Sequence, residues 1–272
     1  MKIFITGATG FIGKHLIHKL LEESVEITIN LRNKSKNLFD KKVKTYYLGL
    51  DIEKDIDFLK KQQFNGVVHL ATYFATTHKP YEIEKLIDSN VKFASYILEC
   101  ASQAKIKWFV NTGTFWQHYQ NETFAPVNLY AATKQAFENI AQFYIETNQI
   151  NFCTLKLSDT YGPEDTRPKI FNLWKNIAKT GKPIDMSPGN QLIDIVYIDD
   201  VINAFLLMIN SKVERPNGAV YVVKSELRYT LKELAAIFEN CINQKLNINW
   251  GGRRYNDREV MVPWESGTLI PG

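Results

Sequence analysis

Residues 2–13 read Lys-Ile-Phe-Ile-Thr-Gly-Ala-Thr-Gly-Phe-Ile-Gly, and this stretch decides the fold. An apolar run typical of a buried strand leads to glycines at positions 7, 10 and 13, the last of which lies in a helical pattern. This spacing allows a tight turn, close approach of the backbone to a phosphate group and close packing of the helix on the strand. Free N–H groups at the helix N-terminus favour anions. The stretch predicts a dinucleotide-binding turn; a purely structural glycine turn is the alternative.

Strand-like and helix-like segments alternate over about the first 160 residues, which predicts a parallel sheet. Strands are expected at residues 2–6, 26–31, 44–48, 66–71, 108–112 and 152–157, and helices at 11–23, 83–103, 131–147, 170–180, 199–209 and 230–243. The predicted fold class is α/β, a Rossmann doubly wound parallel sheet with a small C-terminal substrate-binding lobe. We expect residues 1–160, with 190–223 returning to them, to form the Rossmann domain, and residues 161–189 and 224–272 to form the lobe.

The composition excludes several classes of protein. The 272 residues are 45% hydrophobic and 23% charged, as in ordinary soluble enzymes, and no run of 18 apolar residues predicts a membrane helix. Three widely spaced cysteines form neither a disulfide framework nor a CxxC metal site, which fits a reducing compartment. The net charge of +4 comes from interspersed Lys and Glu, unlike a nucleic-acid-binding surface. We expect a cytoplasmic protein with no metal, nucleic-acid or membrane partner.

Short motifs follow the glycine turn in a characteristic order. They are Asp51-Ile52, His69-Leu70-Ala71-Thr72 and Asn90-Val91, and together with the turn they resemble the extended short-chain dehydrogenase/reductases, which act on nucleotide sugars and related molecules. In that family the first pair flanks the adenine ring, and the second motif is a strand beside the cofactor. The resemblance implies cofactor contacts by Gly7, Thr9, Gly10, Phe11, Ile12, Gly13, Asp51, Ile52, Leu70, Ala71, Thr72, Asn90, Tyr130 and Lys134.

The end of the second strand bears on the choice of cofactor. Residues 29–34 read Ile-Asn-Leu-Arg-Asn-Lys, without the acidic residue that binds the ribose hydroxyls in an NAD site. Arg32 and Lys34 instead offer cations where a 2′-phosphate would lie, and arginine can bind phosphate through two hydrogen bonds. We expect NADP(H) as the cofactor. NAD(H), with a solvated basic turn at these residues, is the alternative.

Tyr130 and Lys134 form a YxxxK pair, and at positions i and i+4 their side chains share one face of a helix. Tyrosine has a pKa near 10, and a nearby ammonium lowers it toward the range useful for proton transfer. As in the family, Lys134 is also expected to hydrogen-bond the nicotinamide ribose. The third catalytic residue is expected to be Thr112, four residues before Trp116, because relatives carry Ser or Thr followed by an aromatic at this spacing. Thr114 is the alternative.

The predicted substrate side departs from other members of the family. Gly113 and Thr114 stand where nucleotide-sugar 4,6-dehydratases carry Asp and Glu, so the acid–base pair for water elimination is missing. Residues 159–163 resemble the family's NVYGP segment, with Asp in place of the Asn that touches the sugar nucleotide. For Arg167 and Lys169 a solvated loop is the alternative to a diphosphate contact, and Arg253 is the alternative to Arg254. We expect the substrate to be contacted by Thr112, Thr114, Asp159, Arg167, Lys169 and Arg254.

Four segments resemble one branch of the family more closely, the CDP-abequose and CDP-paratose synthases; they are residues 111–119, 126–130, 159–163 and 258–261. Those enzymes reduce the C4 ketone of a CDP-4-keto-3,6-dideoxyhexose with NADPH for surface polysaccharide. The resemblance implies an NADPH-dependent ketoreductase that binds a nucleotide-sugar substrate, and it leaves a homodimer open. The sequence is also compatible with a nucleotide-sugar C4 epimerase that holds NAD tightly, and with a non-catalytic NADP-binding regulatory protein.

Overall fold

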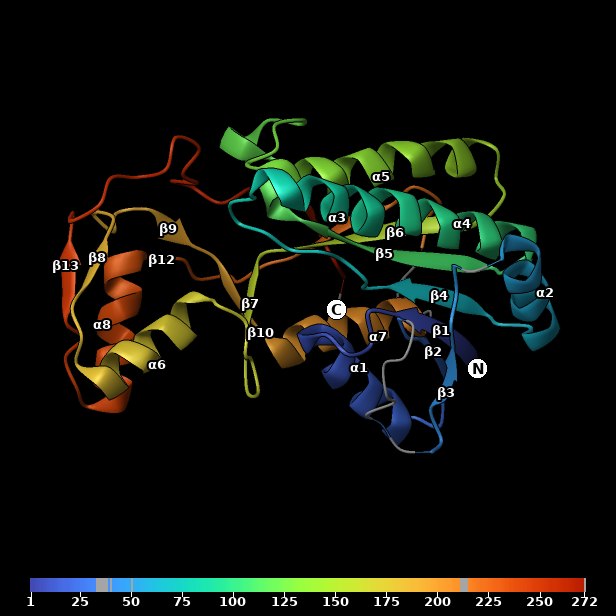
Figure 1. The fold of residues 1–272 in the computed structure, drawn as a ribbon, viewed down its shortest axis with the longest axis horizontal. Coiled ribbons are helices and arrows are strands. Elements are labelled where there is room, and N and C mark those ends of the chain that lie inside the picture. Colours follow the sequence, from blue (N-terminus) through green and yellow to red (C-terminus); the bar gives the residue numbers. More distant parts are fainter. Residues whose placement is uncertain (33–38, 40, 50, 211–214, 272) are drawn as a thin grey trace.

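The computed structural model describes residues 1–32, 39, 41–49, 51–210 and 215–271. Its centre is a parallel sheet of eight strands: β1 (Lys2–Thr6), β2 (Glu26–Asn30), β3 (Lys44–Tyr46), β4 (Gly66–His69), β5 (Trp108–Thr114), β6 (Asn151–Leu157), β11 (Val220–Val223) and β14 (Thr268–Leu269). The order across the sheet is β14-β11-β6-β5-β4-β1-β2-β3, and every neighbouring pair is parallel (Figure 1). The predicted fold class is confirmed.

Helices cover both faces of this sheet (Figure 1). One layer contains α1 (Phe11–Glu22) and α7 (Ile198–Ile209); the other contains α2 (Ile52–Gln62), α4 (Phe93–Gln103) and α5 (Leu129–Glu146). Successive side chains of a strand point to opposite faces. On β1, Ile3 and Ile5 therefore pack in the first layer and Phe4 packs in the second, and all three are fully buried.

The chain changes direction at β1, and this positions the site. From β1 it moves outward to β2 and β3, and it then crosses to β4, β5 and β6 on the other side. β1 and β4 are neighbours in register, so that Thr6 lies beside His69 at their carboxyl ends. Ligands of doubly wound sheets bind outside the carboxyl ends of the strands at such a switch point. The glycine turn that follows Thr6 lies there.

A smaller part of the molecule lies beyond one end of the sheet (Figure 1). Its core is a separate cluster around Trp174 and Leu234, and Thr230 and Glu233 form a reciprocal capping box at the start of α8. Short strands pair here as β7 with β10, β9 with β12 and β8 with β13. The elements are β7 (Asp159–Tyr161), α6 (Ile170–Thr180), β8 (Ile184–Met186), β9 (Leu192–Ile193), β10 (Ile195–Tyr197), β12 (Tyr229–Thr230), α8 (Leu231–Ile242) and β13 (Ile248–Trp250).

The structure differs from the predicted elements in several places, among them the short strands of the smaller part. The helix expected over 83–103 consists of α3 (Ile83–Ile87), a π-helical turn η2 (Asp88–Lys92) and α4. The sequence analysis did not predict α2, because most of its side chains are polar. In the structure only Asp55 and Leu59 of this helix are buried. The chain end returns from the range expected to form the lobe, since β14 pairs with β11 at the edge of the large sheet. The described residues also include three short 3₁₀ turns: η1 (Pro80–Glu82), η3 (Phe115–Gln117) and η4 (Tyr119–Asn121).

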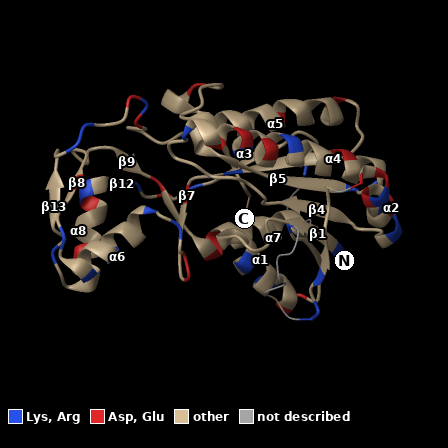
Figure 2. Cartoon of the chain, in the orientation of Figure 1, with Lys and Arg blue, Asp and Glu red and all other residues tan. Residues whose placement is uncertain are grey.

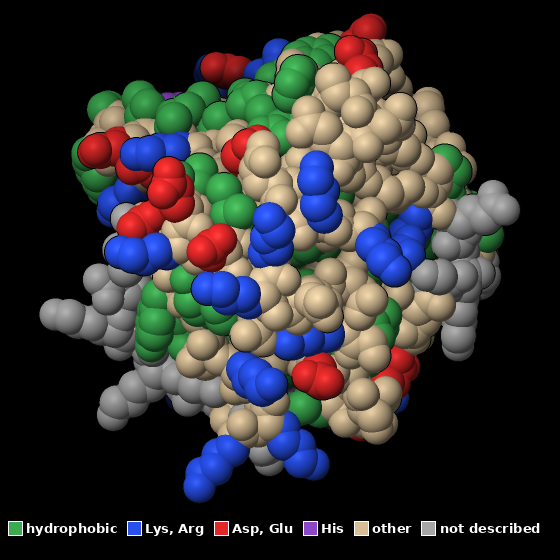
Figure 3. All heavy atoms as spheres, turned by 90° about the vertical axis from the view of Figure 1, so that its right-hand side faces the viewer, with side chains coloured by type: hydrophobic (Ala, Val, Ile, Leu, Met, Phe, Trp, Pro, Cys, Tyr) green, Lys and Arg blue, Asp and Glu red, His purple; other side chains and the backbone are tan. Residues whose placement is uncertain are grey.

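Charged side chains concentrate on the helices and connecting loops (Figure 2). α2 carries both signs, and Lys61 lies 3.9 Å from Asp57 one helical turn away. Acidic side chains also lie among the basic ones on the face in Figure 3, so the positive charge is dispersed there. None of the helices in the described ranges is both long and apolar enough to cross a membrane.

Candidate active site

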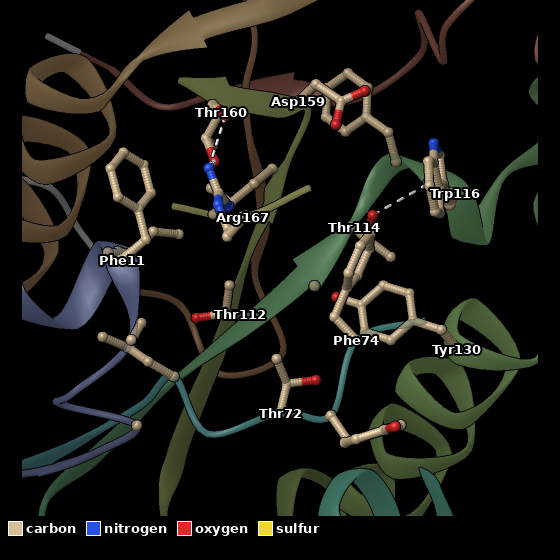
Figure 4. A pocket seen from close by; sticks show the side chains of 18 of the residues that line it. Phe11, Thr72, Phe74, Thr112, Thr114, Trp116, Tyr130, Asp159, Thr160 and Arg167 are labelled. Carbon is tan, nitrogen blue, oxygen red and sulfur yellow. Dashed lines mark hydrogen bonds between the residues drawn. The ribbon is translucent and has the colours of Figure 1, made fainter. Parts of the chain in front are cut away.

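A cavity of about 1150 Å³ opens at the switch point, outside the carboxyl ends of β1, β4 and β5. Its wall combines the glycine turn with side chains from the smaller part of the molecule. Figure 4 shows Phe11 and Arg167 of these two sides next to each other, and Thr112 and Thr114 along β5. Most of the residues predicted from the sequence line it. They are Gly7, Thr9, Gly10, Phe11, Ile12, Gly13, Arg32, Leu70, Ala71, Thr72, Thr112, Thr114, Tyr130, Asp159, Arg167 and Lys169.

The glycine turn has a geometry that larger residues would disrupt. Gly7 has φ +71°, and a Cβ there would lie 2.4 Å from the backbone nitrogen of Ala71. A Cβ on Gly13 would lie 2.5 Å from the carbonyl oxygen of Gly7. Gly10 precedes α1, and no side chain caps this helix N-terminus. Its exposed N–H groups and the tight backbone around them fit a pyrophosphate, so the turn fits a dinucleotide.

Asn90 lies behind the cavity wall instead of in it, and it comes from the π-helical turn. Its Oδ1 accepts hydrogen bonds from the Thr72 hydroxyl at 2.9 Å and the Tyr73 N–H at 2.7 Å, while its Nδ2 donates to Thr133 Oγ1 at 2.9 Å. The side chain is almost fully buried. The structure therefore gives Asn90 a positioning role for the segment after β4, in place of the predicted direct contact with the cofactor.

The predicted adenine pair, Asp51 and Ile52, does not line the cavity. The side chain of Asp51 caps α2 and pairs with Lys54 at 2.9 Å. Leu48 lines the cavity instead, and its N–H donates to Asn30 Oδ1 at 3.0 Å. Sequence reasoning missed Leu48 because it placed this leucine at the end of the strand expected at 44–48, where it is not distinguishable from a core residue.

Arg32 lies at the cavity wall, just beyond the end of β2, and its side chain is exposed. It is therefore available to a charged group bound at this end of the cavity. Lys34, predicted as its partner, lies outside the described residues.

Tyr130 lies in the first turn of α5 and faces the cavity, with its ring packed edge-on against Phe74 at 5.0 Å between ring centres. Burial raises the pKa of Tyr130 to about 12, while the Thr72 hydroxyl and the Arg167 charge lower it. This differs from our expectation that Lys134 lowers the pKa of Tyr130. Lys134 is buried and does not line the cavity, and burial lowers the pKa of Lys134 to about 8 because desolvation disfavours the ammonium.

The two threonines of β5 differ in their hydrogen bonds. The hydroxyl of Thr112 donates to the carbonyl oxygen of His69 at 3.1 Å. The hydroxyl of Thr114 accepts from the Trp116 N–H at 3.3 Å and so begins η3 (Figure 4). Gly113 between them has no room for a side chain, since a Cβ would lie 2.9 Å from Glu138 Oε1. An acidic residue at position 113 would therefore require its surroundings to move.

Charged side chains of the smaller part reach the cavity in pairs. Lys169 pairs with Asp159, and its ammonium lies 5.1 Å from the ring centre of Phe74. Arg167 donates to Asp165 through two nitrogens, at 2.7 and 2.8 Å, and its guanidinium lies 4.2 Å from the ring centre of Phe11. Both predicted cations are thus held at the cavity wall by acidic partners.

Arg254 is exposed and does not line the cavity, contrary to our expectation. Arg258 lines it instead, with its guanidinium 4.2 Å from the ring centre of Tyr119. Both arginines lie in a segment without helix or strand, where the sequence has no periodicity to show which side chain turns inward. Other lining residues that sequence reasoning missed are Tyr73, His118, Gln191, Asp194, Glu259, Val260, Pro263 and Trp264.

A doubly wound sheet with this turn at its switch point is the fold of the nucleotide-binding Rossmann enzymes. The chain belongs to the NAD dependent epimerase/dehydratase family, whose model matches residues 3–223. This confirms the resemblance to the extended short-chain dehydrogenase/reductases.

Relatives and solved structures extend this comparison. The chain is 29% identical over 265 residues to a CDP-abequose synthase of Salmonella muenchen, with 96% of this chain and 87% of that protein covered. It is 28% identical over 264 residues to a CDP-abequose synthase of Yersinia pseudotuberculosis, with 97% and 92% covered. Among solved structures, a UDP-glucose 4-epimerase of Thermotoga maritima with UDP-glucose matches with TM-score 0.84 at 20% identity, over 98% of this chain and 90% of that one. A UDP-glucuronic acid 4-epimerase of Bacillus cereus with UDP-glucuronic acid and NAD matches with TM-score 0.83 at 20% identity, over 97% and 90%.

Proposed function

We propose that the protein reduces the C4 ketone of a nucleotide-linked 4-keto-3,6-dideoxyhexose with NADPH, and that the nucleotide is CDP. The observation that carries the proposal is a single cavity that extends from the glycine turn to Thr112 and Tyr130. A dinucleotide held at the turn would therefore reach a substrate held beside Tyr130. The similarity to CDP-abequose synthases supports this choice of sugar nucleotide and a role in making surface polysaccharide sugars.

When bound at the glycine turn, NADPH would supply the hydride for reduction of the ketone carbon. Tyr130 donates its phenolic proton to the ketone oxygen, because burial keeps the phenol protonated at neutral pH. Thr112 orients that oxygen by redirecting the hydrogen bond that it now donates to His69. Lys134, one turn further along α5, is buried behind the wall and would have to reach past it to hold the ribose of the cofactor. Arg258, Arg167 and Lys169 would surround the substrate diphosphate.

The absence of space at Gly113 supports reduction over elimination of water. A 4,6-dehydratase needs an acid and a base beside the sugar, and in its relatives these follow the catalytic threonine. Here the first position is closed by Glu138, Gln117 and Lys156, and the second is Thr114, whose hydroxyl caps η3. Neither residue can exchange protons at neutral pH.

A C4 epimerase is the second candidate, because epimerases are among the solved structures of the same fold. An epimerase returns its hydride to the same sugar and keeps its cofactor, whereas a reductase must release it after each turnover. Arg32 at the cavity wall supports NADPH as the cofactor. Purified protein should therefore carry little bound dinucleotide. Consumption of NADPH separates the reductase from a regulatory NADP-binding protein, which would bind NADPH without consuming it.

The decisive experiment offers the enzyme 4-keto-3,6-dideoxyhexoses linked to CDP, dTDP, GDP and UDP. We expect one NADPH to be consumed for each CDP-linked ketone, with deuterium from 4-deuterated NADPH recovered at sugar C4. Interconversion of C4 epimers without net consumption of NADPH would instead establish the epimerase.

Tyr130→Phe tests the assigned proton donor. Because only the hydroxyl is removed, the variant should fold and bind NADPH like the wild type, while kcat falls by about 10²–10⁴-fold. Fluorescence titration with NADPH and steady-state rates measure the two effects. Near-normal turnover by a folded Tyr130→Phe enzyme would remove Tyr130 from the donor role.

A further inference from the structure

A lysine lies inside the central sheet. Lys156 belongs to β6, between β5 and β11, and it pairs with Gly113 and Val222. Its side chain is only 4% exposed. Gly113 makes room for it, since a Cβ there would lie 2.8 Å from Lys156 Cγ. A buried ammonium is costly unless it has partners, and a buried ion pair is a weak source of stability, so the lysine needs another explanation.

The partners of Lys156 fix the state of a histidine. Its ammonium lies 3.2 Å from Glu138 Oε2 and 2.7 Å from His118 Nε2. An ammonium only donates hydrogen bonds, so Nε2 must be the unprotonated, accepting nitrogen. The ring proton therefore lies on Nδ1, which donates to the carbonyl oxygen of Glu122 at 3.1 Å. Burial and the Lys156 charge lower the pKa of His118 to about 4, which keeps the imidazole neutral.

The neutral imidazole stacks on a tryptophan of the cavity wall. The ring centres of His118 and Trp264 are 3.8 Å apart, with 14° between their planes. Phe115 packs edge-on against the same indole at 5.5 Å, and the Lys156 ammonium lies 5.6 Å from its centre. His118, Phe115 and Trp264 all line the cavity.

Trp264 lies in the segment 256–267, which crosses from the smaller part of the molecule to the sheet without forming a helix or strand. Hydrogen bonds attach this segment at Trp264 and at Glu265, which also accepts from Lys224 and Arg228. Arg228 donates to the Trp264 carbonyl oxygen at 2.9 Å, and the N–H of Glu265 donates to Asn121 Oδ1 at 2.8 Å. The indole ring itself is contacted by His118, Phe115 and the Lys156 ammonium, and the stack on His118 is the shortest of these three contacts.

We propose that Lys156 is a positioning residue: it holds His118 in one orientation so that the imidazole fixes Trp264 as a wall of the substrate half of the cavity. Lys156 touches neither substrate nor cofactor in this role. Only the identity of the ligand rests on the proposed function, a sugar nucleotide whose ring packs against this wall.

Lys156→Met tests the proposal, because methionine fills the site of the lysine stem without donating to His118. Hydrogen exchange should become faster in residues 258–267, and kcat/KM for the sugar nucleotide should fall by about 10–100-fold, the scale of a small misplacement in a site. The dissociation constant for NADPH should stay within about twofold of the wild-type value, because the glycine turn lies on another part of the wall. Lys156→Met/His118→Phe should restore slow exchange, since a phenyl ring stacks without needing an ammonium.

Lys245→Met is the matched control, because Lys245 pairs with Glu239 at 2.6 Å at the far end of the smaller part. Lys245→Met should leave hydrogen exchange in residues 258–267 and kcat/KM for the sugar nucleotide unchanged. Nitrogen-15 NMR of the wild-type histidines adds a test that needs no variant: Nε2 of His118 should resonate as an unprotonated nitrogen at pH 7. A protonated Nε2, or unchanged exchange in folded Lys156→Met, would overturn the proposal. Hydrogen exchange and the NMR measurement do not require turnover, so failure of this proposal can be distinguished from failure of the proposed reaction.

Discussion

The ammonium of Lys169 pairs with the carboxylate of Asp159, and both side chains line the substrate half of the cavity. The family's usual residue at position 159 is asparagine, which would leave this lysine without its anionic partner. In this chain Lys169 must therefore share its charge between Asp159 and any bound anion. The pair is partly exposed, so its attraction is modest.

Asp159→Asn should strengthen binding of the sugar nucleotide. A partly exposed ion pair is worth about 0.2–1 kcal/mol. Without Asp159 as a competing partner, Lys169 can direct this attraction to the diphosphate, which corresponds to a KM about 1.5- to 5-fold lower. Initial rates over a range of substrate concentrations measure this, and the KM for NADPH serves as the internal control. A higher KM for the sugar nucleotide would mean that Asp159 itself binds the substrate.

Two arginines four residues apart allow a matched comparison. Arg258 lines the cavity and Arg254 does not. Arg258→Ala should raise the KM for the sugar nucleotide by about 10–100-fold, because a charge-assisted contact is worth about 1.5–3 kcal/mol. Arg254→Ala removes the same group at a position away from the cavity wall and should change the KM less than about twofold. Equal effects of the two substitutions would contradict this assignment.

Lys134→Met should stabilise the protein without cofactor. The pKa of Lys134 is about 8 in the folded protein, below the ordinary value of 10.5 that the unfolded chain keeps. Between these values the unfolded chain binds a proton that the folded chain does not, so stability rises with pH across this window. Below pH 8 the full cost of burying the ammonium remains, about 3 kcal/mol. Urea unfolding should show the variant to be more stable at pH 7, with the difference shrinking toward pH 10; lower stability at pH 7 would contradict the argument.

Arg32→Ala tests the choice of cofactor. The variant should lose about 1–3 kcal/mol of affinity for NADPH, because it loses a charge-assisted contact with the 2′-phosphate, and its affinity for NADH should not change. Lys44→Ala, which removes an exposed cation at the start of β3, is the control. Titration of both cofactors against the three proteins measures the difference. Equal weakening of both cofactors by Arg32→Ala would point to NAD(H).

The sheet and its switch point could be predicted because apolar runs indicate buried strands and the glycines indicate a tight turn between strand and helix. β1 and α6 have the predicted bounds, and Gly7, with its positive φ, is where the turn requires it. The π-helical turn could not be predicted, because the residues of 83–103 are compatible with an uninterrupted α-helix. Its extra residue is stabilised by contacts of Asn90 with segments far away in the chain.

The site could be predicted where a motif occupies a regular element, as Tyr130 does on α5. It could not be predicted where the backbone is irregular. No periodicity between Gly252 and Met261 shows whether Arg254 or Arg258 lies at the cavity; the resemblance of residues 258–261 to the CDP-abequose and CDP-paratose synthases was the available signal, and it was not applied to this choice. The raised pKa of Tyr130 could not be predicted from the sequence either, because it depends on how deeply the phenol is buried.

The π-helical turn at Asp88–Lys92 has a consequence for the length of the chain. An α-helix advances by about 100° per residue, so one residue fewer in this turn would rotate everything before it relative to everything after it. A shortened chain could still form a continuous helix from α3 to α4. In that helix Asn90 could no longer face Thr72 and Thr133 while α4 kept its present packing on the sheet. A deletion that is harmless to the helix would thus be harmful to the cavity wall, and the number of residues here is set by the site.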